Sequence, residues 1–164
     1  MAAVFNAALP KKDSAGMAKK TSKSKLVAFV LDCSLTVSWF FEDETDAYAE
    51  AVEDSLALSS AVVPSLWPLE VANALLVGER RKRATEAKVT AFLGLLKSLP
   101  ISFDDETGSR VWQESVHLAR THHLSVYDAV YLELALRRSL PLATLDDKLK
   151  TVAEAVGVLG YEPG

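Results

Sequence analysis

The chain has 164 residues and a mass of 17.8 kDa, which is the size of one ordinary domain. Hydrophobic residues make up 49% and charged residues 24%, a balance that excludes disorder along the whole chain. No apolar run approaches the roughly 18 to 20 residues that cross a bilayer, so we expect no membrane association. The single cysteine, Cys33, excludes a disulfide-stapled secreted fold and favours a cytoplasmic protein.

The charge of the chain is unevenly distributed. Residues 1–25 hold six of its 18 basic residues and one of its 22 acids, whereas residues 26–164 hold 12 basic and 21 acidic residues. An acidic body does not bind a phosphate backbone by charge alone, so a nucleic-acid substrate would require a cation at the carboxylates. Because residues 1–25 show no periodicity and are rich in Lys, Ser and Ala, they predict a disordered basic tail. The tail is either a leader without a function or an RNA-contacting arm.

The folded body is predicted to begin with a strand. Residues 26–31 form a continuous apolar run that ends at Asp32, which is typical of a strand buried on both faces of a parallel sheet. A second short strand is expected at 61–63. Ser65 is positioned to cap the helix that follows it. The helices expected in this half of the body span 35–41, 44–58, 66–82 and 85–98.

The second half of the body repeats the alternation of strands and helices. We expect strands at 101–103 and 141–144, a weak strand at 157–159, and helices at 106–122, 125–138 and 146–155. Strands that alternate with helices indicate a parallel sheet covered by helices. The sequence therefore predicts a single α/β domain over residues 26–164, a three-layer α/β/α sandwich with a central, mainly parallel sheet of four to five strands.

Four acids occupy matching places in these elements: Asp32, Glu70, Asp128 and Asp146. Asp32 and Asp146 follow strands, whereas Glu70 and Asp128 lie in the first turns of helices. Ligands of open parallel sheets bind outside the carboxyl ends of the strands, so we expect these acids to converge. Two such charges about 4 Å apart repel by roughly 4 kcal/mol at an effective dielectric near 20, and a cation would relieve that repulsion.

The chemistry of these ligands indicates the cation and the reaction. Carboxylate oxygens and water suit Mg²⁺ or Mn²⁺, which activate water and stabilise charge on a reacting phosphate. Phosphodiester hydrolysis is therefore the predicted reaction. Purely structural interpretations stay open for three of the acids, because Asp128 fits a capping box with Ser125, Asp146 fits an N-cap, and Glu70 suits a helix dipole. Asp32 lacks such an interpretation, since an unpaired charge after an apolar strand is costly.

Four stretches resemble a known family in order and separation: Val-Leu-Asp-Cys-Ser (30–34), Pro-Leu-Glu-Val-Ala-Asn-Ala-Leu (68–75), Ser-Val-Tyr-Asp-Ala-Val-Tyr-Leu-Glu-Leu-Ala (125–135) and Leu-Ala-Thr-Leu-Asp (142–146). They are similar to PIN-domain ribonucleases, and most closely to VapC-type toxins of toxin–antitoxin pairs. The resemblance covers about residues 27–160. It implies a PIN-like fold and a Mg²⁺- or Mn²⁺-dependent endoribonuclease that acts as the toxin of a type II system. It also implies a homodimer and a small VapB-like antitoxin.

The resemblance also implies roles for individual residues. Asp32, Asp128 and Asp146 would hold the metal, and Glu70 would orient or deprotonate the attacking water. Asp147 is the alternative to Asp146, which we favour from its place after Leu-Ala-Thr-Leu. The supporting positions that match the family are Ser34, Thr144 and Asn73.

Further features have two interpretations each. Arg80 and Arg81 belong to the one basic cluster of the body, which is either a solvated helix end or an RNA contact. The side chain of Cys33 is expected to point away from the acids. The alternatives to an endoribonuclease are another metal-dependent phosphoesterase or DNA nuclease, a receiver-like module, and a partner-binding domain without activity. A receiver-like module would need a phosphoacceptor in mid-chain, where Asp104 follows the third predicted strand.

Overall fold

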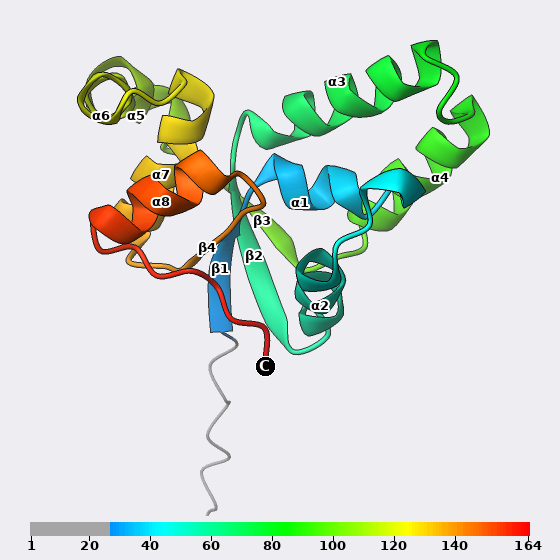
Figure 1. Cartoon of the computed structure of the whole chain (residues 1–164), viewed down its shortest axis with the longest axis horizontal. Helices are drawn as coiled ribbons and strands as arrows, with labels where there is room; N and C mark the ends of the chain where they lie inside the picture. Colours follow the sequence, from blue (N-terminus) through cyan, green and yellow to red (C-terminus); the bar gives the residue numbers. More distant parts are fainter. Residues whose placement is uncertain (1–26) are drawn as a thin grey trace, which may run out of the picture.

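The computed structural model describes residues 27–164, which form a four-stranded sheet between two layers of helices (Figure 1). The sheet order is β3-β2-β1-β4, and every neighbouring pair is parallel. The strands are β1 Val27–Leu31, β2 Ser59–Pro64, β3 Ile101–Asp104 and β4 Leu142–Ala143. The predicted α/β sandwich with a parallel sheet is therefore confirmed. The predicted tail at 1–25 lies outside the described residues.

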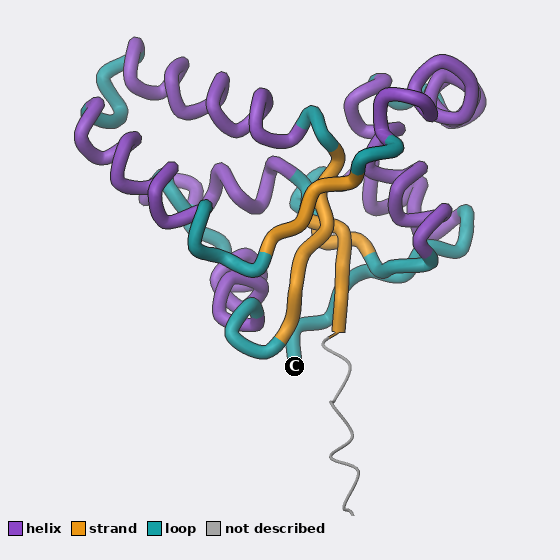
Figure 2. Tube along the Cα trace, turned by 180° about the vertical axis from the view of Figure 1, so that it is seen from behind, coloured by secondary structure: helices purple, strands orange, loops and turns teal. Residues whose placement is uncertain are grey.

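Eight α-helices cover the sheet in the described part of the chain. They are α1 Cys33–Ser38, α2 Ala47–Ser55, α3 Trp67–Arg80, α4 Glu86–Leu96, α5 Thr107–Arg110, α6 Val116–His122, α7 Val126–Arg138 and α8 Asp147–Ala155. Figures 1 and 2 show α1 to α4 on one side of the sheet and α5 to α8 on the other. None of the helices between residues 27 and 164 is both long and apolar enough to cross a membrane.

The strand order changes direction between β1 and β4. The chain moves from β1 outward through β2 to β3, and then returns past β1 to β4 through α5, α6 and α7. The carboxyl ends of β1 and β4 therefore lie at the topological switch point, which is where open parallel sheets bind their ligands. Asp32 directly follows β1, and Thr144 directly follows β4.

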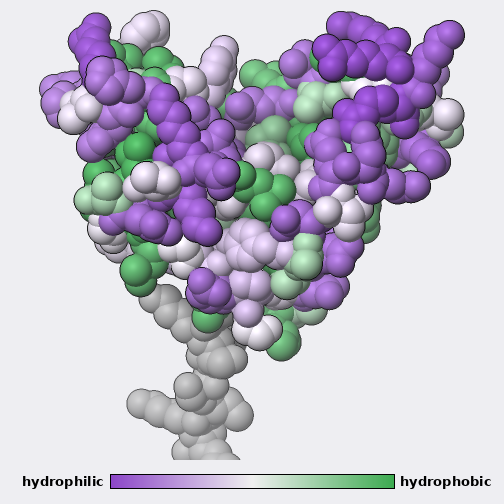
Figure 3. Space-filling view, viewed as in Figure 1, coloured by the Kyte–Doolittle hydropathy of each residue, from purple (hydrophilic) through white to green (hydrophobic). Residues whose placement is uncertain are grey.

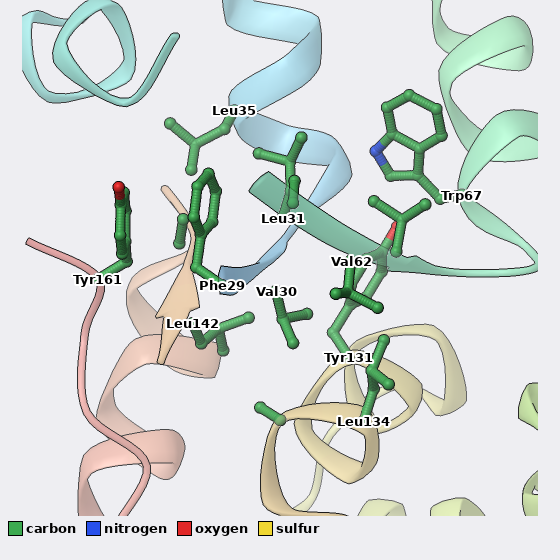
Figure 4. Packing of buried hydrophobic residues seen from close by; sticks show 14 of the residues in the cluster. Phe29, Val30, Leu31, Leu35, Val62, Trp67, Tyr131, Leu134, Leu142 and Tyr161 are labelled. Atoms are coloured by element: carbon green, nitrogen blue, oxygen red, sulfur yellow. The ribbon is translucent and has the colours of Figure 1, made fainter. Parts of the chain in front are cut away.

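The central strand β1 is buried on both faces, as its apolar run predicts. Figure 4 shows Phe29 and Leu31 on the face toward Leu35 of α1, and Val30 on the opposite face toward α7. All three β1 side chains are fully buried. The ring of Phe29 also stacks on Tyr161, with the ring centroids 3.8 Å apart. The strand is thus anchored in the core, and Asp32, which follows its last residue, lies at the switch point.

The start of α3 differs from the prediction. The N-cap residue of this helix is Leu66, and no side chain caps it. Ser65 therefore does not cap the helix, and its backbone N–H donates a hydrogen bond to Thr107 Oγ1 at 3.2 Å. Pro68 lies in the first turn and has no N–H to satisfy, which reduces the need for a cap.

Two further segments differ from the prediction. The helix expected at 106–122 is divided into α5 and α6 by a π-helical turn, Val111–Ser115. The weak strand expected at 157–159 is reduced to one bridge between Leu142 and Gly160. Gly157, with a φ of 87°, turns the chain just before that bridge, so the sheet has the lower of the two predicted strand counts.

A buried ion pair fixes α7 against the end of β3. Arg137 Nη2 lies 2.8 Å from Asp104 Oδ2, and Arg137 Nε lies 2.8 Å from Glu133 Oε1. The carboxylate of Asp104 is fully buried and also accepts a hydrogen bond from Thr107 Oγ1 at 3.1 Å. Asp104 is therefore a structural residue rather than an accessible phosphoacceptor, which argues against the receiver-like alternative.

Candidate active site

Asp32 lies at the centre of the switch point. It is the N-cap residue of α1 but makes no capping hydrogen bond through its side chain. Its Oδ2 atom instead accepts hydrogen bonds from Ser34 Oγ at 2.5 Å and from Thr144 Oγ1 at 2.7 Å. Both hydroxyl donors bond the same oxygen, which leaves Oδ1 for a ligand. Burial raises the pKa of Asp32, and the charge of Asp128 adds to that effect.

The two hydroxyls also fix the loop after β4. Ser34 Oγ accepts a hydrogen bond from the backbone N–H of Leu145 at 3.0 Å, and Thr144 Oγ1 accepts one from the N–H of Asp146 at 3.0 Å. The predicted supporting residues Ser34 and Thr144 thus join the ends of β1 and β4 around the Asp32 carboxylate. Their hydroxyls act as both donors and acceptors in one connected network.

Glu70 approaches the site from the first turn of α3. It is half-buried, and its Oε2 atom accepts a hydrogen bond from the hydroxyl of Tyr131 at 2.5 Å. The pKa of Glu70 is raised, mainly by burial and further by the charges of Asp32 and Asp128, while the Tyr131 hydrogen bond lowers it. The charges of Asp32, which follows β1, and of Asp128 on α7 thus both act on the carboxylate of Glu70 on α3.

Asp128 forms the capping hydrogen bonds with Ser125 that the sequence offered as its structural interpretation. Ser125 Oγ accepts a hydrogen bond from the Asp128 N–H at 3.0 Å and donates one to Asp128 Oδ2 at 2.7 Å. Ser125 is thus the N-cap of α7. The Asp128 charge nevertheless reaches both Asp32 and Glu70. Capping therefore orients this carboxylate without removing it from the site.

Asp146 is less closely integrated than the other three acids. It is exposed, and its Oδ1 atom caps α8 by accepting a hydrogen bond from the N–H of Leu149 at 2.7 Å. The contact that joins it to the site is its backbone hydrogen bond to Thr144. Asp147 is also exposed, and it is the first residue of α8. The structural interpretation of Asp146 as an N-cap is therefore correct, and its role toward a metal stays a prediction.

The four acids are not packed into a closed metal cage. Within residues 27–164, no three His, Cys, Asp or Glu side chains lie close enough together to hold an ion directly. Mg²⁺ commonly keeps several of its waters and binds one or two carboxylates, so a spaced set of acids is compatible with it. The donor set is all oxygen, and a cation would offset the charges of Asp32 and Asp128, which add to the burial that raises the pKa of Glu70. The residues present therefore fit a hard divalent cation.

A cavity of about 550 Å³ opens beside Glu70. The residues that line it are Cys33, Leu66, Leu69, Glu70, Asn73 and Tyr127. Asn73 was predicted to face the site and does so. Cys33 was predicted to point away, and this prediction is wrong: the residue lines the cavity, and burial together with the Glu70 and Asp32 charges raises the pKa of its thiol. The thiol is therefore held protonated and is a poor nucleophile.

Arg80 and Arg81 lie at the opposite end of α3 from Glu70. At 1.5 Å per residue, Arg80 lies about 15 Å along the helix from Glu70. Both arginines are exposed, and neither makes an ion pair with any residue from 27 to 164. The neighbouring Arg83, by contrast, pairs with Asp43 and Glu44 at 2.7 Å each. Figure 3 shows the surface hollowed between the end of α3 and the α5–α6 segment.

Residues 29–155 match the PIN domain family, so this protein belongs to that family, whose members are generally metal-dependent nucleases. Among solved structures it is similar to PAE2754 from Pyrobaculum aerophilum, a crystal structure with 25% sequence identity and a TM-score of 0.56. The alignment covers 76% of this chain and 78% of that chain. No curated protein matches the sequence.

Proposed function

We propose that this PIN-domain protein is a Mg²⁺- or Mn²⁺-dependent endoribonuclease and the toxin of a type II toxin–antitoxin pair, acting in the cytoplasm. The observation that carries the proposal is the geometry at the switch point of the sheet, where Ser34 and Thr144 hold the Asp32 carboxylate and Tyr131 of α7, the helix that carries Asp128, holds Glu70. Burial raises the pKa of Asp32 and of Glu70, and the neighbouring carboxylate charges add to that effect, which is typical of groups arranged for a charged ligand.

In this proposal the residues divide into metal ligands and a base. Asp32 and Asp128 hold the cation, directly or through water, and Asp146 completes the set from the α8 N-terminus. When bound, the metal lowers the pKa of water and stabilises charge on the phosphate. Glu70 accepts the proton of the attacking water, because it lines the cavity next to the proposed metal ligands. Tyr131 keeps the Glu70 carboxylate oriented through its hydrogen bond.

The hydroxyls of Ser34 and Thr144 have a separate role, which is to orient the Asp32 carboxylate. By donating to Asp32 Oδ2, Ser34 and Thr144 turn the other oxygen of this carboxylate toward the ligand. They also hold the loop that carries Asp146. This preorganisation lowers the cost of assembling the charged site.

Partners follow from the same site. A small VapB-like antitoxin would silence the enzyme by placing a basic side chain among the acids, where no cation of residues 27–164 forms an ion pair with Asp32, Glu70 or Asp128. We also expect a homodimer. Inhibition by the product of an adjacent small gene, and the mass in sedimentation experiments, test these two expectations.

Activity assays test the function itself. The wild-type protein should cleave RNA oligonucleotides with Mg²⁺ or Mn²⁺ and lose this activity in EDTA. Asp32→Asn and Asp128→Asn should each reduce cleavage by about 100-fold or more. Glu154→Gln is the matched control, because this exposed acid of α8 is not a candidate ligand. Wild-type rates in Asp32→Asn would refute the proposal.

The same assay with DNA addresses the DNA-nuclease alternative. Cleavage of DNA oligonucleotides with no cleavage of RNA would favour that alternative. Metal binding provides an independent readout: Mn²⁺ should raise the melting temperature of the wild-type protein, and Asp128→Asn should diminish the shift. A shift that survives in both Asp32→Asn and Asp128→Asn would assign the metal to other residues.

A further inference from the structure

The cavity beside Glu70 has one feature that the catalytic acids do not explain. Two large apolar side chains, Leu69 and Tyr127, line it while remaining 73% and 63% exposed. They come from different helices, α3 and α7, that are joined by the Tyr131–Glu70 hydrogen bond. Exposed apolar side chains gathered on one cavity mark a binding surface rather than a packing defect.

Each apolar residue directly precedes a proposed catalytic residue. Leu69 precedes Glu70, and Tyr127 precedes Asp128 in the first turn of α7. Since Glu70 itself lines the cavity, a phosphodiester that reaches Glu70 brings the attached nucleoside into the same space. The cavity of about 550 Å³ is large enough for a nucleotide. The side chains of Leu69 and Tyr127 are therefore placed to contact the sugar and base of the substrate.

We infer that Tyr127 and Leu69 bind the base next to the scissile phosphate, with the base stacked on the Tyr127 ring and packed against Leu69. The inference rests on the proposed nuclease function and adds the form of its substrate. A base inside a duplex has both faces covered by its neighbours, so the base bound here must be unpaired. Stacking on an aromatic ring is the usual way in which proteins hold unpaired bases, and it tolerates any base because each has a flat face.

The test uses a short single-stranded oligoribonucleotide with uncleavable linkages and 2-aminopurine at one position in turn. Wild-type protein should quench the fluorescence of the stacked position in Mg²⁺. Tyr127→Ala should abolish the quenching and weaken binding by about 5- to 100-fold, whereas Tyr127→Phe should retain both. With an abasic nucleotide at that position, Tyr127→Ala and the wild type should bind equally, which a merely structural role of Tyr127 would not produce.

Phe103→Ala is the matched control. Phe103 is 59% exposed and lines a different cavity with Trp67, so its loss should leave oligonucleotide binding unchanged. Equal oligonucleotide binding by the wild type and Tyr127→Ala would overturn the inference and leave the nuclease proposal standing. This conclusion would hold even if Tyr127→Ala no longer bound a basic antitoxin peptide. A wild-type protein that neither bound nor cleaved RNA would overturn both.

Discussion

The hydroxyl of Tyr131 donates a hydrogen bond to Glu70 Oε2 at 2.5 Å, joining α7 to α3 across 61 residues of sequence. Tyr131 is buried, and Asp128 lies one turn before it on the same helix. The bond therefore fixes the distance between two acids that come from different elements. The bond also makes the buried Tyr131 part of the site, although its sequence context alone is that of a core residue.

Tyr131→Phe should retain the fold, because the ring stays in place, and lose about 1.5 to 3 kcal/mol of unfolding free energy, as measured by urea denaturation. The cleavage rate should fall more than the KM changes. Since the lost hydrogen bond lowers the pKa of Glu70, the acidic limb of the rate profile should move to higher pH.

The control for this variant is Tyr48→Phe. The Tyr48 hydroxyl donates to the carbonyl of Tyr161 at 2.8 Å, away from the acids. Its removal should cost stability without moving the pH profile. An acidic limb that stays unchanged in Tyr131→Phe would contradict the assigned role of Glu70.

Asp32→Asn should make the metal-free protein more stable at pH 7 while removing its activity. Burial raises the pKa of Asp32 in the folded state, so the native protein binds more protons than the unfolded one in the range above the ordinary Asp pKa. Stability from this group is present at low pH and is lost as the pH rises through the raised value. Asn can accept the same hydrogen bonds from Ser34 and Thr144.

Urea denaturation in EDTA measures this difference. The advantage of Asp32→Asn should be largest at pH 7 and should diminish as the pH falls toward the ordinary Asp pKa, because the raised pKa of Asp32 lets the native carboxyl take up its proton first. The opposite result, a stability of the variant relative to the wild type that is lower at pH 7 than at pH 4, would show that other groups compensate the buried Asp32 charge in the metal-free protein.

Charge reversal of Arg80 and Arg81 should weaken RNA binding in a salt-dependent manner. If each arginine contacts one phosphate, the slope of log K against log salt should decrease in magnitude by about 1.4, since each contact on a single strand contributes about 0.7. The double substitution Lys97→Glu and Lys150→Glu changes the net charge equally, and both lysines are exposed. An identical effect of the two double variants would leave Arg80 and Arg81 as an ordinary solvated helix end.

Arg137→Ala should destabilise the protein by about 3 to 5 kcal/mol, because it leaves the fully buried Asp104 carboxylate without its closest partner. Arg110→Ala is the comparison. Arg110 also bonds two carboxylates, of Glu106 and Glu114, but on the surface. Its loss should cost far less, because exposed ion pairs contribute little to stability. Equal costs in chemical denaturation would mean that the Arg137 network is no better shielded from water than the surface pairs.

Much of the fold follows from local patterns in the sequence. The apolar run before Asp32 predicted a strand buried on both faces, and Phe29 to Leu31 are fully buried. Boundaries were less predictable where tertiary contacts compete with local signals. Ser65 has the chemistry of a cap, but its N–H bonds Thr107 instead, and the π-helical turn at Val111–Ser115 has no periodicity signal that distinguishes it from an α-helix.

The candidate site, like the fold, was only partly predictable from the sequence. The sequence predicted that Asp32, Glu70, Asp128 and Asp146 converge, because the carboxyl ends of parallel strands share one edge of a sheet. In residues 27–164 no three such side chains lie close enough together to hold an ion directly. The sequence left open whether Asp128 caps a helix or serves the site; the structure shows its hydrogen bonds with Ser125 at the start of α7, and its role toward a metal stays a prediction. The orientation of Cys33 was predicted wrongly, because α1 begins at this residue and the alternation of a strand no longer applies.

The order of residues by itself determined the fold class, the edge at which the acids gather and the chemistry of their ligands, because periodicity and strand ends are local properties. Only the tertiary structure decided that Tyr131 orients Glu70, that Thr144 joins Asp32 to Asp146, and that Leu69 and Tyr127 share a cavity. Which side chains of two helices meet depends on the rotation and crossing of those helices, and these are set by packing of the whole core rather than by any single segment.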